Sequence, residues 1–418
     1  MGEQTRGGIQ VPPLPFPAVA SGFRPGGIAV QYPAMHEPDR TYRVFISAVE
    51  PSADVHCAAL ITALTRRHPG VRFAGIGGDK MAAAGCPLID RTTDRGAMGL
   101  NGLREVGYFL GLLKRIKRSL QSDRPDLVVV CDSPSFNFHV AKAARRAGIR
   151  TAFYVAPQLW AWAGWRIGKL RRTCDRLCCV LPFEEQWFKT RGVEATFVGN
   201  PLVERLGDLS GNAKTYADLD RRPLRIGLMP GSRTAEIRGL WRPMQQIALR
   251  LRADHPRAQF AAVAVNDLRR KQLQADQVPG FECEYSIDSV YRTSTQVDFS
   301  LVASGSATLE VAAAGCPMVV MYRAGRIAWN LVGRWITTAP FFSLVNLIAG
   351  RELVREFVPH FTSIDPIVDH ATRLLADRAG LDRLSRDLVA LTQPLAGKRA
   401  SEEVAGILLG MMSEGGEG

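Results

Sequence analysis

The chain has 418 residues and carries 53 Lys and Arg against 40 Asp and Glu, which gives a formal net charge of +13. With 46% hydrophobic and 22% charged residues, this is a globular composition, and it excludes whole-chain disorder, a collagen-like fibre and a small disulfide scaffold. At about 150 residues per domain, the length predicts two or three domains, each able to bury a core.

The eight cysteines are typical of buried thiols in a reducing compartment rather than of a disulfide framework. The cluster Cys174, Cys178 and Cys179 is a poor metal site, because no His is near and adjacent strand residues point to opposite faces. We therefore expect no metal and no cofactor. No window reaches the roughly 18–20 uninterrupted apolar residues that a membrane-spanning helix needs, so we expect a soluble or peripheral protein.

The order of elements is the main evidence for the fold. Residues 1–40 are rich in Gly and Pro and predict a loose leader. From Tyr42 onward, short apolar runs alternate with helical patterns. The first half predicts strands at 43–48, 72–76, 127–131, 151–155 and 177–181, with helices at 55–67, 103–120 and 138–147. Strands that alternate with helices in this way indicate a parallel sheet covered on both faces.

The pattern pauses over a polar stretch and then restarts. The second half predicts strands at 224–229, 259–265, 297–302 and 318–322, with helices at 240–254 and 307–314. We predict two doubly wound, Rossmann-like α/β domains that face each other across a cleft. Their ranges are 41–200 and 224–363, with a linker at 201–223 and C-terminal helices and a tail at 364–418.

Two turns of the second half are candidate nucleotide-binding turns, because open parallel sheets bind ligands beyond the carboxyl ends of their strands. The first turn contains Gly231, Ser232 and Arg233. Free N–H groups of the following helix would face an anion, and Arg233 would bind phosphate. The alternative is a capped helix with a surface arginine.

The second turn contains Ser304, Gly305 and Ser306, with Glu310 one turn into the next helix. A carboxylate placed there can accept hydrogen bonds from the two hydroxyls of a ribose, while the small residues leave room for a diphosphate. Taken alone, Glu310 is typical of a solvated helix residue. The two turns together favour a nucleotide-diphosphate site.

The first half has no glycine-rich phosphate loop but places carboxylates at strand ends. Glu50 and Asp54 follow the first strand, and Asp54 has the alternative role of capping the helix at 55–67. Asp132 directly ends the strand at 127–131, where a carboxylate overhangs the cleft and suits a general base.

Two segments are candidates for membrane or acceptor contact. Residues 98–118 are apolar nearly all round at first and end in four cations, which resembles a membrane-surface helix. The alternative is a buried helix with a solvated basic end. The aromatic and basic patch at 160–172 could also bind phosphate or nucleic acid, or merely lie at the surface. The candidate contact residues are Met98, Leu103, Leu110, Leu113, Lys114, Arg115, Lys117, Arg118, Trp160 and Trp162.

From about residue 43 to 375 the chain resembles the lipid-A-disaccharide synthase family, bacterial glycosyltransferases of the two-domain GT-B fold. The resemblance is specific because the order and spacing of the motifs match as well as their residues. The matching segments include Glu50–Asp54, Gly75–Gly78, Ala97–Gly99, Asp132–Asn137, Tyr154–Trp162, Leu181–Glu184, Pro230–Glu236, Ala303–Glu310 and Asn346–Glu352.

The resemblance implies condensation of UDP-2,3-diacylglucosamine with 2,3-diacylglucosamine 1-phosphate at the cytoplasmic face of the inner membrane. The product would be a β-1,6-linked disaccharide 1-phosphate, with release of UDP and without a metal. Asp132 would be the base, and Glu50 and Asp54 are further candidate catalytic residues. Arg233 would contact the diphosphate. The other donor-site residues implied are Ser304, Glu310, Asn346, Arg351 and Glu352.

Several family positions are altered in this chain. Val49, Pro51 and Ala53 replace the Gly or Ala expected in the first loop, and a Cβ there narrows the approach of a ligand. The other replacements are Ser135 for an acidic residue, Asn200 for a His and Val345 for a Pro.

Two alternative functions remain at this stage. One is another UDP-sugar-dependent GT-B enzyme. The other is a catalytically altered relative or a nucleic-acid binder. A nucleic-acid binder should show interleaved base-stacking platforms on a continuous basic stripe, and we expect no nucleic-acid partner.

Overall fold

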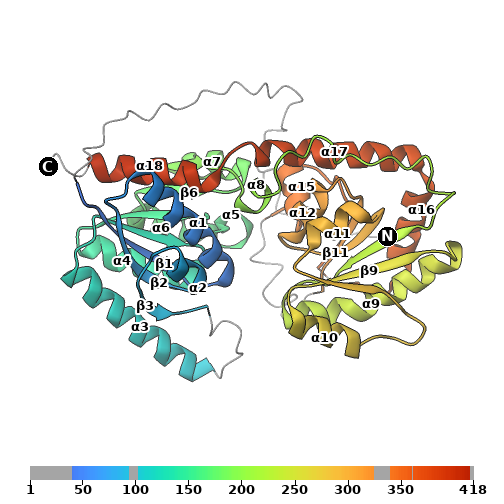
Figure 1. Cartoon of the computed structure of the whole chain (residues 1–418), viewed down its shortest axis with the longest axis horizontal. Coiled ribbons are helices and arrows are strands. Elements are labelled where there is room, and N and C mark those ends of the chain that lie inside the picture. The colour runs from blue at the N-terminus through green and yellow to red at the C-terminus, as the bar shows by residue number, and fades with distance from the viewer. Residues whose placement is uncertain (1–39, 94–101, 324–338, 360, 415–418) are drawn as a thin grey trace, which may run out of the picture.

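The computed structural model describes residues 40–93, 102–323, 339–359 and 361–414. In the described chain, two lobes each contain one parallel sheet, and the lobes lie side by side (Figure 1). The two expected α/β domains are therefore confirmed. No helix in the described part of the chain is long and apolar enough to cross a bilayer.

The first sheet has seven described strands in the order β3-β2-β1-β4-β5-β6-β7. Its strands are β1 Arg43–Ala48, β2 Arg72–Gly77, β3 Leu88–Arg91, β4 Leu127–Cys131, β5 Arg150–Tyr154, β6 Arg176–Cys179 and β7 Ala195–Phe197. Its helices are α1 Pro51–Arg67, α2 Asp79–Ala83, α3 Gly102–Ser122, α4 Pro134–Arg146, α5 Leu159–Trp162, α6 Ile167–Thr173, α7 Pro182–Lys189 and α8 Pro201–Glu204, with a short 3-10 helix at Gly164–Arg166.

Strand β4 shows why this sheet is covered on both faces. All five of its residues are buried, and alternate side chains enter different cores. Val128 and Val130 pack in the core that includes α3 and α4, whereas Val129 and Cys131 pack in the core that includes α1. The two-residue period of a strand thus divides one apolar run between two layers of helices.

The second sheet has six described strands in the order β10-β9-β8-β11-β12-β13. Its strands are β8 Arg225–Met229, β9 Gln259–Ala264, β10 Glu284–Ile287, β11 Phe299–Ala303, β12 Met318–Met321 and β13 Glu356–Phe357. The helices that follow Glu204 are α9 Thr234–Asp254, α10 Asp267–Ala275, α11 Val290–Gln296, α12 Ala307–Ala313, α15 Leu344–Ala349, α16 Asp365–Ala376, α17 Arg378–Ala396 and α18 Ala400–Glu414.

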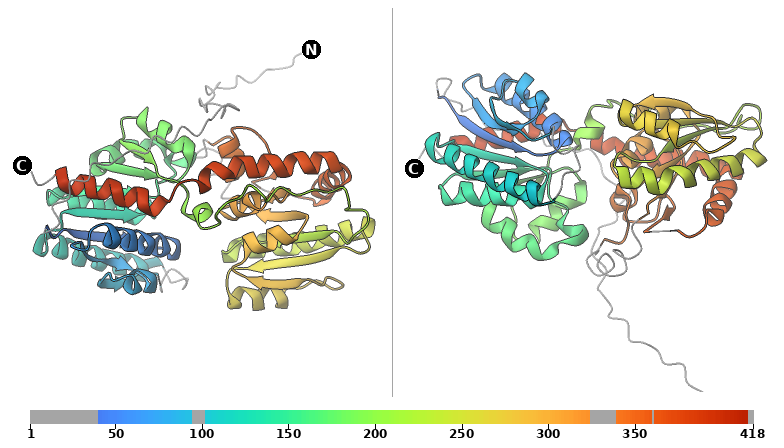
Figure 2. Two further views of the ribbon diagram at one scale, coloured as in Figure 1. Left: turned by 45° about the horizontal axis from the view of Figure 1, so that its top comes forward. Right: turned by 90° about the horizontal axis from the view of Figure 1, so that it is seen from below.

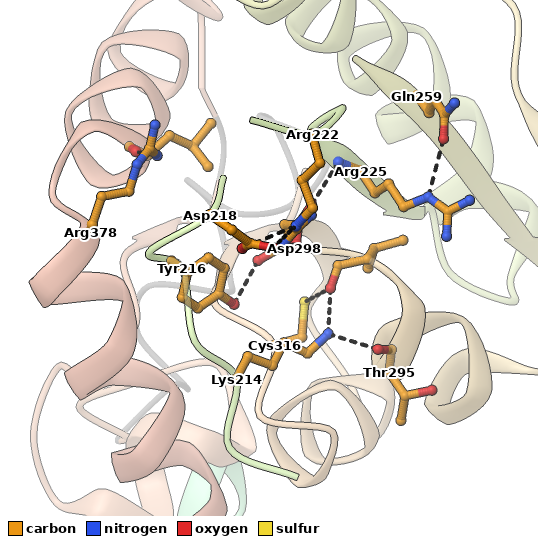
Figure 3. Close-up of polar contacts among 12 residues, drawn as sticks. Lys214, Tyr216, Asp218, Arg222, Arg225, Gln259, Thr295, Asp298, Cys316 and Arg378 are labelled. Carbon is orange, nitrogen blue, oxygen red and sulfur yellow. Dashed lines mark hydrogen bonds and ion pairs between the residues drawn. The ribbon is translucent and has the colours of Figure 1, made fainter. Parts of the chain in front are cut away.

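The polar stretch before β8 is fastened to the second domain (Figure 3). The Lys214 ammonium donates to the carbonyls of Ser294, Thr295 and Val297, which lie at and just beyond the end of α11. The Arg222 guanidinium makes two hydrogen bonds to the Asp298 carboxylate, at 2.7 and 2.8 Å. These contacts hold residues 214–222 against the amino end of the second sheet.

The chain crosses back to the first domain near its end (Figure 1). Helix α17 packs on α12 of the second domain, whereas α18 packs on α1 of the first. Glu402 of α18 pairs with Arg66 and Arg67 of α1. The sequence predicted helices here but did not reveal that one of them completes the opposite domain, because an apolar helix face does not say which core it joins. Figure 2 shows the same crossing from two further directions.

Candidate functional site

Each sheet has one place where the strand order reverses direction, and the predicted turns lie there. In the first sheet, β1 and β4 are neighbours, and β2 and β5 lie on their outer sides. In the second sheet, β8 and β11 hold the corresponding positions. Ligands of doubly wound sheets bind in the crevice beyond such strand ends. The turns with Glu50 and Asp132, and those with Arg233 and Ser304, are therefore in the expected positions.

The turn after β4 holds Asp132 in an unusual backbone conformation. Asp132 and Ser133 have φ values of 52° and 42°, in the left-handed region that non-glycine residues rarely adopt. Fully buried Asn137 supports the turn, since its amide donates to the carbonyls of Cys131 and Asp132 at 2.9 and 2.8 Å. Its amide oxygen also accepts a hydrogen bond from the Ser47 hydroxyl at 2.7 Å. Backbone strain that neighbouring groups maintain is a feature of functional sites.

The electrostatic surroundings of Asp132 favour a base. Burial raises the pKa of its carboxyl group, and the nearby Glu50 carboxylate raises it further. The Ser133 N–H and the Arg233 guanidinium act in the opposite direction and lower this pKa. Because Arg233 belongs to the second domain, its influence indicates that the two switch-point edges face each other. Glu50 in turn accepts a hydrogen bond from the Ser133 hydroxyl at 2.9 Å.

The Asp54 carboxylate is used in hydrogen bonds that support the fold. It accepts hydrogen bonds from the backbone N–H groups of Gly78, Lys80 and Met81, at 2.8 to 3.1 Å, and the residue is 4% exposed. It caps α2, not its own helix, which begins earlier, at Pro51. The expected cap at residue 55 is therefore wrong, and we leave Asp54 out of the catalytic set proposed below.

The first nucleotide turn differs from the prediction in one respect. The Glu236 carboxylate accepts hydrogen bonds from the N–H groups of Ser232 and Arg233 at 3.0 and 3.1 Å, so these groups do not point freely at an anion. Gly231 has a φ of 96°, and a Cβ there would lie 2.3 Å from the Glu236 carboxylate. A carboxylate three residues into a helix commonly caps it in this way. The Arg233 side chain is 79% exposed, and its guanidinium lies 3.5 Å from the Glu236 carboxylate.

The second nucleotide turn is open to solvent. Gly305 and Ser306 are exposed, and a Cβ on Gly305 would have no atom within 4 Å. The Ser304 hydroxyl donates to the carbonyl of Phe342 at 2.8 Å, so Ser304 holds the turn and does not project from it. Burial raises the pKa of Glu310, and Arg205 lies 3.8 Å from its carboxylate.

Asn346 lies behind this turn. It is fully buried, and its amide donates to the carbonyl of Val354 and to the Glu356 carboxylate, while its oxygen accepts from the N–H groups of Leu353 and Val354. These four hydrogen bonds, of 2.7 to 2.9 Å, use the whole capacity of the side chain. In this structure Asn346 therefore has no free polar atom for the direct contact with the UDP-sugar that we expected. Instead, it supports the turn from within the domain.

The structure does not bring Arg351 and Glu352 to the two turns. Arg351 lies 3.5 Å from Asp387 of α17, and Glu352 pairs with Arg355 at 3.1 Å. Glu352 lines a separate cavity of about 570 Å³, which also includes Met318 at the amino end of β12. This is the edge of the sheet opposite to the switch-point turns.

Helix α3 has a buried side and an exposed side. Leu112 and Ile116 are buried against the sheet, and Arg115 pairs with Asp90. The exposed side presents Val106 and Leu110, which are 58% and 63% exposed. Leu113 is partly buried, whereas Lys114, Lys117 and Arg118 are exposed. Met98 and the side chain of Leu103 lie outside the described residues.

The aromatic and basic patch is divided between the interior and the surface of the domain. Trp160 is 3% exposed, and its indole N–H donates to the buried Glu184 carboxylate at 3.0 Å. A surface contact through Trp160 is therefore wrong, because its polar atom is satisfied inside the domain. Burial raises the pKa of Glu184 to about 7. The side chain of Trp162 lies outside the described part of the chain, and Trp165 is 67% exposed.

The altered family positions fit the local structure. Pro51 is the first residue of α1, a favourable place for proline, and Ala53 and Val345 are fully buried. Asn200 caps α8, since its side-chain oxygen accepts from the N–H groups of Leu202 and Val203 at 3.0 and 3.4 Å. Val49 is half-buried, and Ser135 is exposed.

Solved structures with the same architecture support the GT-B assignment. A UDP-N-acetylglucosamine 2-epimerase aligns with a TM-score of 0.58 at 13% identity, covering 90% of this chain and 98% of its own. The calicheamicin glycosyltransferase aligns with a TM-score of 0.55 at 16% identity, covering 90% and 99%. Identities this low establish the fold alone.

The relatives in sequence are much closer. The lipid-A-disaccharide synthase of Geobacter sulfurreducens is 32% identical over 385 residues, covering 90% of this chain and 98% of that protein. The synthase of Anaeromyxobacter dehalogenans strain 2CP-1 is 34% identical over 385 residues, covering 90% and 100%. The family model described as lipid-A-disaccharide synthetase matches residues 44–400. The chain therefore belongs to the lipid-A-disaccharide synthase family of glycosyltransferases.

Proposed function

We propose that this glycosyltransferase condenses UDP-2,3-diacylglucosamine with 2,3-diacylglucosamine 1-phosphate to form the β-1,6-linked lipid A disaccharide 1-phosphate and UDP. Family membership supports a UDP-sugar donor and a lipid acceptor. The observation that carries the proposal is the opposition of a half-buried carboxylate of raised pKa, Asp132, to the Arg233 guanidinium of the other domain. The first group can take a proton, and the second can receive a diphosphate.

Asp132 is the proposed general base. Its carboxylate takes the proton of the acceptor 6-hydroxyl while that oxygen attacks the anomeric carbon of the donor. The bond from the anomeric carbon to the diphosphate oxygen breaks, and UDP leaves with the electron pair. One displacement of this kind inverts the configuration at the anomeric carbon. A raised pKa strengthens the base, and a positioned base typically contributes about 10²–10⁴-fold in rate.

The second domain provides the proposed donor site. Arg233 meets the charge that develops on the diphosphate, the open Gly305–Ser306 turn leaves room for it, and Glu310 accepts hydrogen bonds from the ribose. In this mechanism fixed protein donors stabilise the leaving group, so we expect turnover to continue in the presence of a chelator.

Helix α3 is the proposed membrane contact. Val106 and Leu110 offer apolar insertion, and Lys114, Lys117 and Arg118 would attract an anionic surface by at most about 1 kcal/mol each. The contact is therefore peripheral and sensitive to salt, as reversible attachment to the cytoplasmic face of the inner membrane requires.

The reaction is tested by incubating the purified protein with both proposed substrates and detecting the disaccharide by mass spectrometry. The Arg233→Gln variant should bind UDP more weakly by about 10- to 100-fold, because a charge-assisted contact is lost. Activity that disappears in EDTA and returns with Mg²⁺ would contradict the metal-free mechanism. Failure to form any disaccharide would overturn the proposed substrates.

The membrane contact has its own test. Replacing Lys114, Lys117 and Arg118 by Gln should reduce sedimentation with anionic liposomes and leave UDP affinity unchanged. Arg115 is kept, because its pairing with Asp90 holds α3 in place. A control removes three exposed cations of the second domain, whose loss should have little effect. These residues are Arg221, Arg257 and Arg292.

A further inference from the structure

Three exposed apolar side chains gather at one edge of the second domain. Val265 directly follows β9, Ile287 ends β10, and Leu268 lies in the first turn of α10. The two strands are parallel, and Ala264 pairs with Ile287, so Val265 and Ile287 emerge at the same edge. The three side chains are 43%, 42% and 70% exposed, and no other described large apolar side chain of this domain is as exposed. We call these three residues the β9–β10 patch.

The β9–β10 patch borders the proposed donor turn. Strand β9 lies beside β8, whose end leads into the Arg233 turn. The Arg269 guanidinium of α10 donates to the Thr234 hydroxyl at 2.7 Å, which ties this helix to the start of α9. A surface that touches the patch therefore lies close to the bound donor.

Cations outnumber acidic residues around the patch, where exposed Asp288 follows Ile287 and exposed Asp267 precedes Leu268. Helix α10 carries Arg269, Arg270 and Lys271 against a single acidic residue, Asp267, which pairs with the last two. The start of the neighbouring helix α9 adds the exposed Arg238. Exposed aliphatic groups among cations fit the interface of an anionic bilayer, where apolar insertion and charge attraction add.

The patch also lies on the same side of the molecule as the proposed membrane helix. Helices α3 and α10 both lie at the lower side in Figure 1, one in each lobe. Both lobes thus present exposed aliphatic side chains and cations on elements that share this side: Val106 and Leu110 on one, and Leu268 on the other.

We infer that the β9–β10 patch is a second membrane contact, so that both domains of the enzyme rest on the same anionic bilayer. The inference rests on the proposed function, in which lipid substrates bring the protein to the membrane. It extends that function, because the donor domain is then held at the surface from which the donor lipid is drawn. A bilayer that contacts both domains also favours one relative arrangement of the two switch-point edges.

The test compares liposome sedimentation of three variants of the full chain, with vesicles that contain phosphatidylglycerol. The patch variant combines Val265→Thr, Leu268→Gln and Ile287→Thr, and the α3 variant combines Val106→Thr and Leu110→Gln. The control is Val55→Thr, at a side chain that is 46% exposed and belongs to neither surface. We expect the patch variant to bind vesicles about tenfold more weakly, with unchanged UDP affinity and an unchanged control.

The outcomes separate this inference from the proposed function. If the α3 variant loses vesicle binding and the patch variant binds as wild type does, the second contact is wrong and the peripheral attachment stands. If neither variant loses binding, both are wrong. If the patch variant binds vesicles normally but loses turnover on detergent-dispersed donor, the patch holds acyl chains and not the bilayer. A smaller oligomer in sedimentation equilibrium, with normal vesicle binding, would assign the patch to contact between copies.

Discussion

The two switch-point edges share a topology but differ in their backbone and charge. The edge of the first domain places non-glycine residues at positive φ, in Asp132, Ser133 and Val155, and raises the pKa of a carboxyl group by burying it. At the edge of the second domain, Gly231 takes the positive φ in the Arg233 turn, Asp288 has a positive φ just beyond β10, and the Arg233 side chain stays 79% exposed. The comparison teaches that, in the proposed mechanism, the group that takes the proton is partly buried in a supported turn, whereas the group that receives a charged ligand remains accessible.

The largest expected effect concerns Asp132, at the switch-point edge of the first domain. Asp132→Asn should lower turnover by about 10²–10⁴-fold, because the amide cannot take a proton, while UDP affinity stays within about twofold. Stability should not fall, since the raised pKa means that burial disfavours the ionised carboxylate. Steady-state kinetics and urea unfolding measure both effects. If the variant keeps more than a tenth of wild-type turnover, Asp132 is not the general base.

The second prediction compares the amino ends of the two sheets, where each domain uses an aspartate to accept a strand N–H. Asp298 accepts from the Arg225 N–H at 2.8 Å and pairs twice with Arg222, and it is 5% exposed. Asp298→Ala should reduce the free energy of unfolding by about 3–4 kcal/mol, because the buried groups lose their partner.

The matched change in the first domain is Asp175→Ala. Asp175 accepts from the Thr151 N–H at 2.7 Å and pairs with Arg145, but the side chains of this pair are 29% and 48% exposed. Solvent screens the pair, so the loss should be about 1–2 kcal/mol. Equal losses in urea unfolding would show that the amino ends of the two sheets are anchored alike.

The third prediction concerns pH and two buried groups of the first domain. Burial raises the pKa of Glu184 to about 7, so the folded state binds more protons than the unfolded state, and stability falls by about 3 kcal/mol as pH rises from about 4.5 to 7. Burial, with help from Arg205, lowers the pKa of His56 to about 4. His56 therefore changes stability in the opposite direction: its contribution to the free energy of unfolding, also about 3 kcal/mol, is lost as pH falls from about 6.5 to 4.

Because the two contributions oppose each other, single variants should separate them. Glu184→Gln should leave a stability that rises with pH between about 4 and 6.5, and His56→Gln one that falls as pH rises from about 4.5 to 7. Urea unfolding across this range is the measurement. Curves for the two variants that run parallel would show that neither group titrates as its burial implies.

The smallest effect concerns helix caps in the two domains. Asn200 caps α8 with two accepted N–H bonds and also donates to the Val180 carbonyl at 3.1 Å, and it is 5% exposed. Asn266 caps α10 with one accepted bond and is exposed. Asn200→Ala should therefore cost about 1–2 kcal/mol, and Asn266→Ala about 0.5 kcal/mol, in thermal unfolding. The reverse order would contradict a tightly held connection between the domains.

The sequence predicted the elements whose signal is local. Strands 43–48 and 127–131 were located to the residue, because each is a run of apolar residues that burial requires on both sheet faces. Edge strands β3, β7, β10 and β13 were missed, since they are short and largely half-buried or exposed. The switch-point turns were found because they follow from strand ends.

The roles of individual polar side chains were less predictable. Asp54 finds its partners at 78–81, and Asn346 at 353–356, so their hydrogen bonds depend on the folded arrangement of separate segments. The indole N–H of Trp160 finds its hydrogen-bond partner in Glu184, 24 residues further along the chain. The supporting role of Asn137 had one sequence signal, its place five residues after Asp132, and the positive φ values that it stabilises are not visible in a sequence.

Because α18 packs on the first domain, that domain cannot be completed until the ribosome has synthesised the end of the chain. The apolar face of α1 packs with Val404, Leu408 and other residues of α18 in one core. About 200 residues separate the end of β7 from the end of α18, so at 5–20 residues per second the ribosome needs roughly 10–40 s to supply the missing helix. During that interval the nascent first domain exposes the surface that α18 will cover. Premature termination within α18 should therefore destabilise the first domain, although that domain is synthesised first, while the second domain keeps its own core.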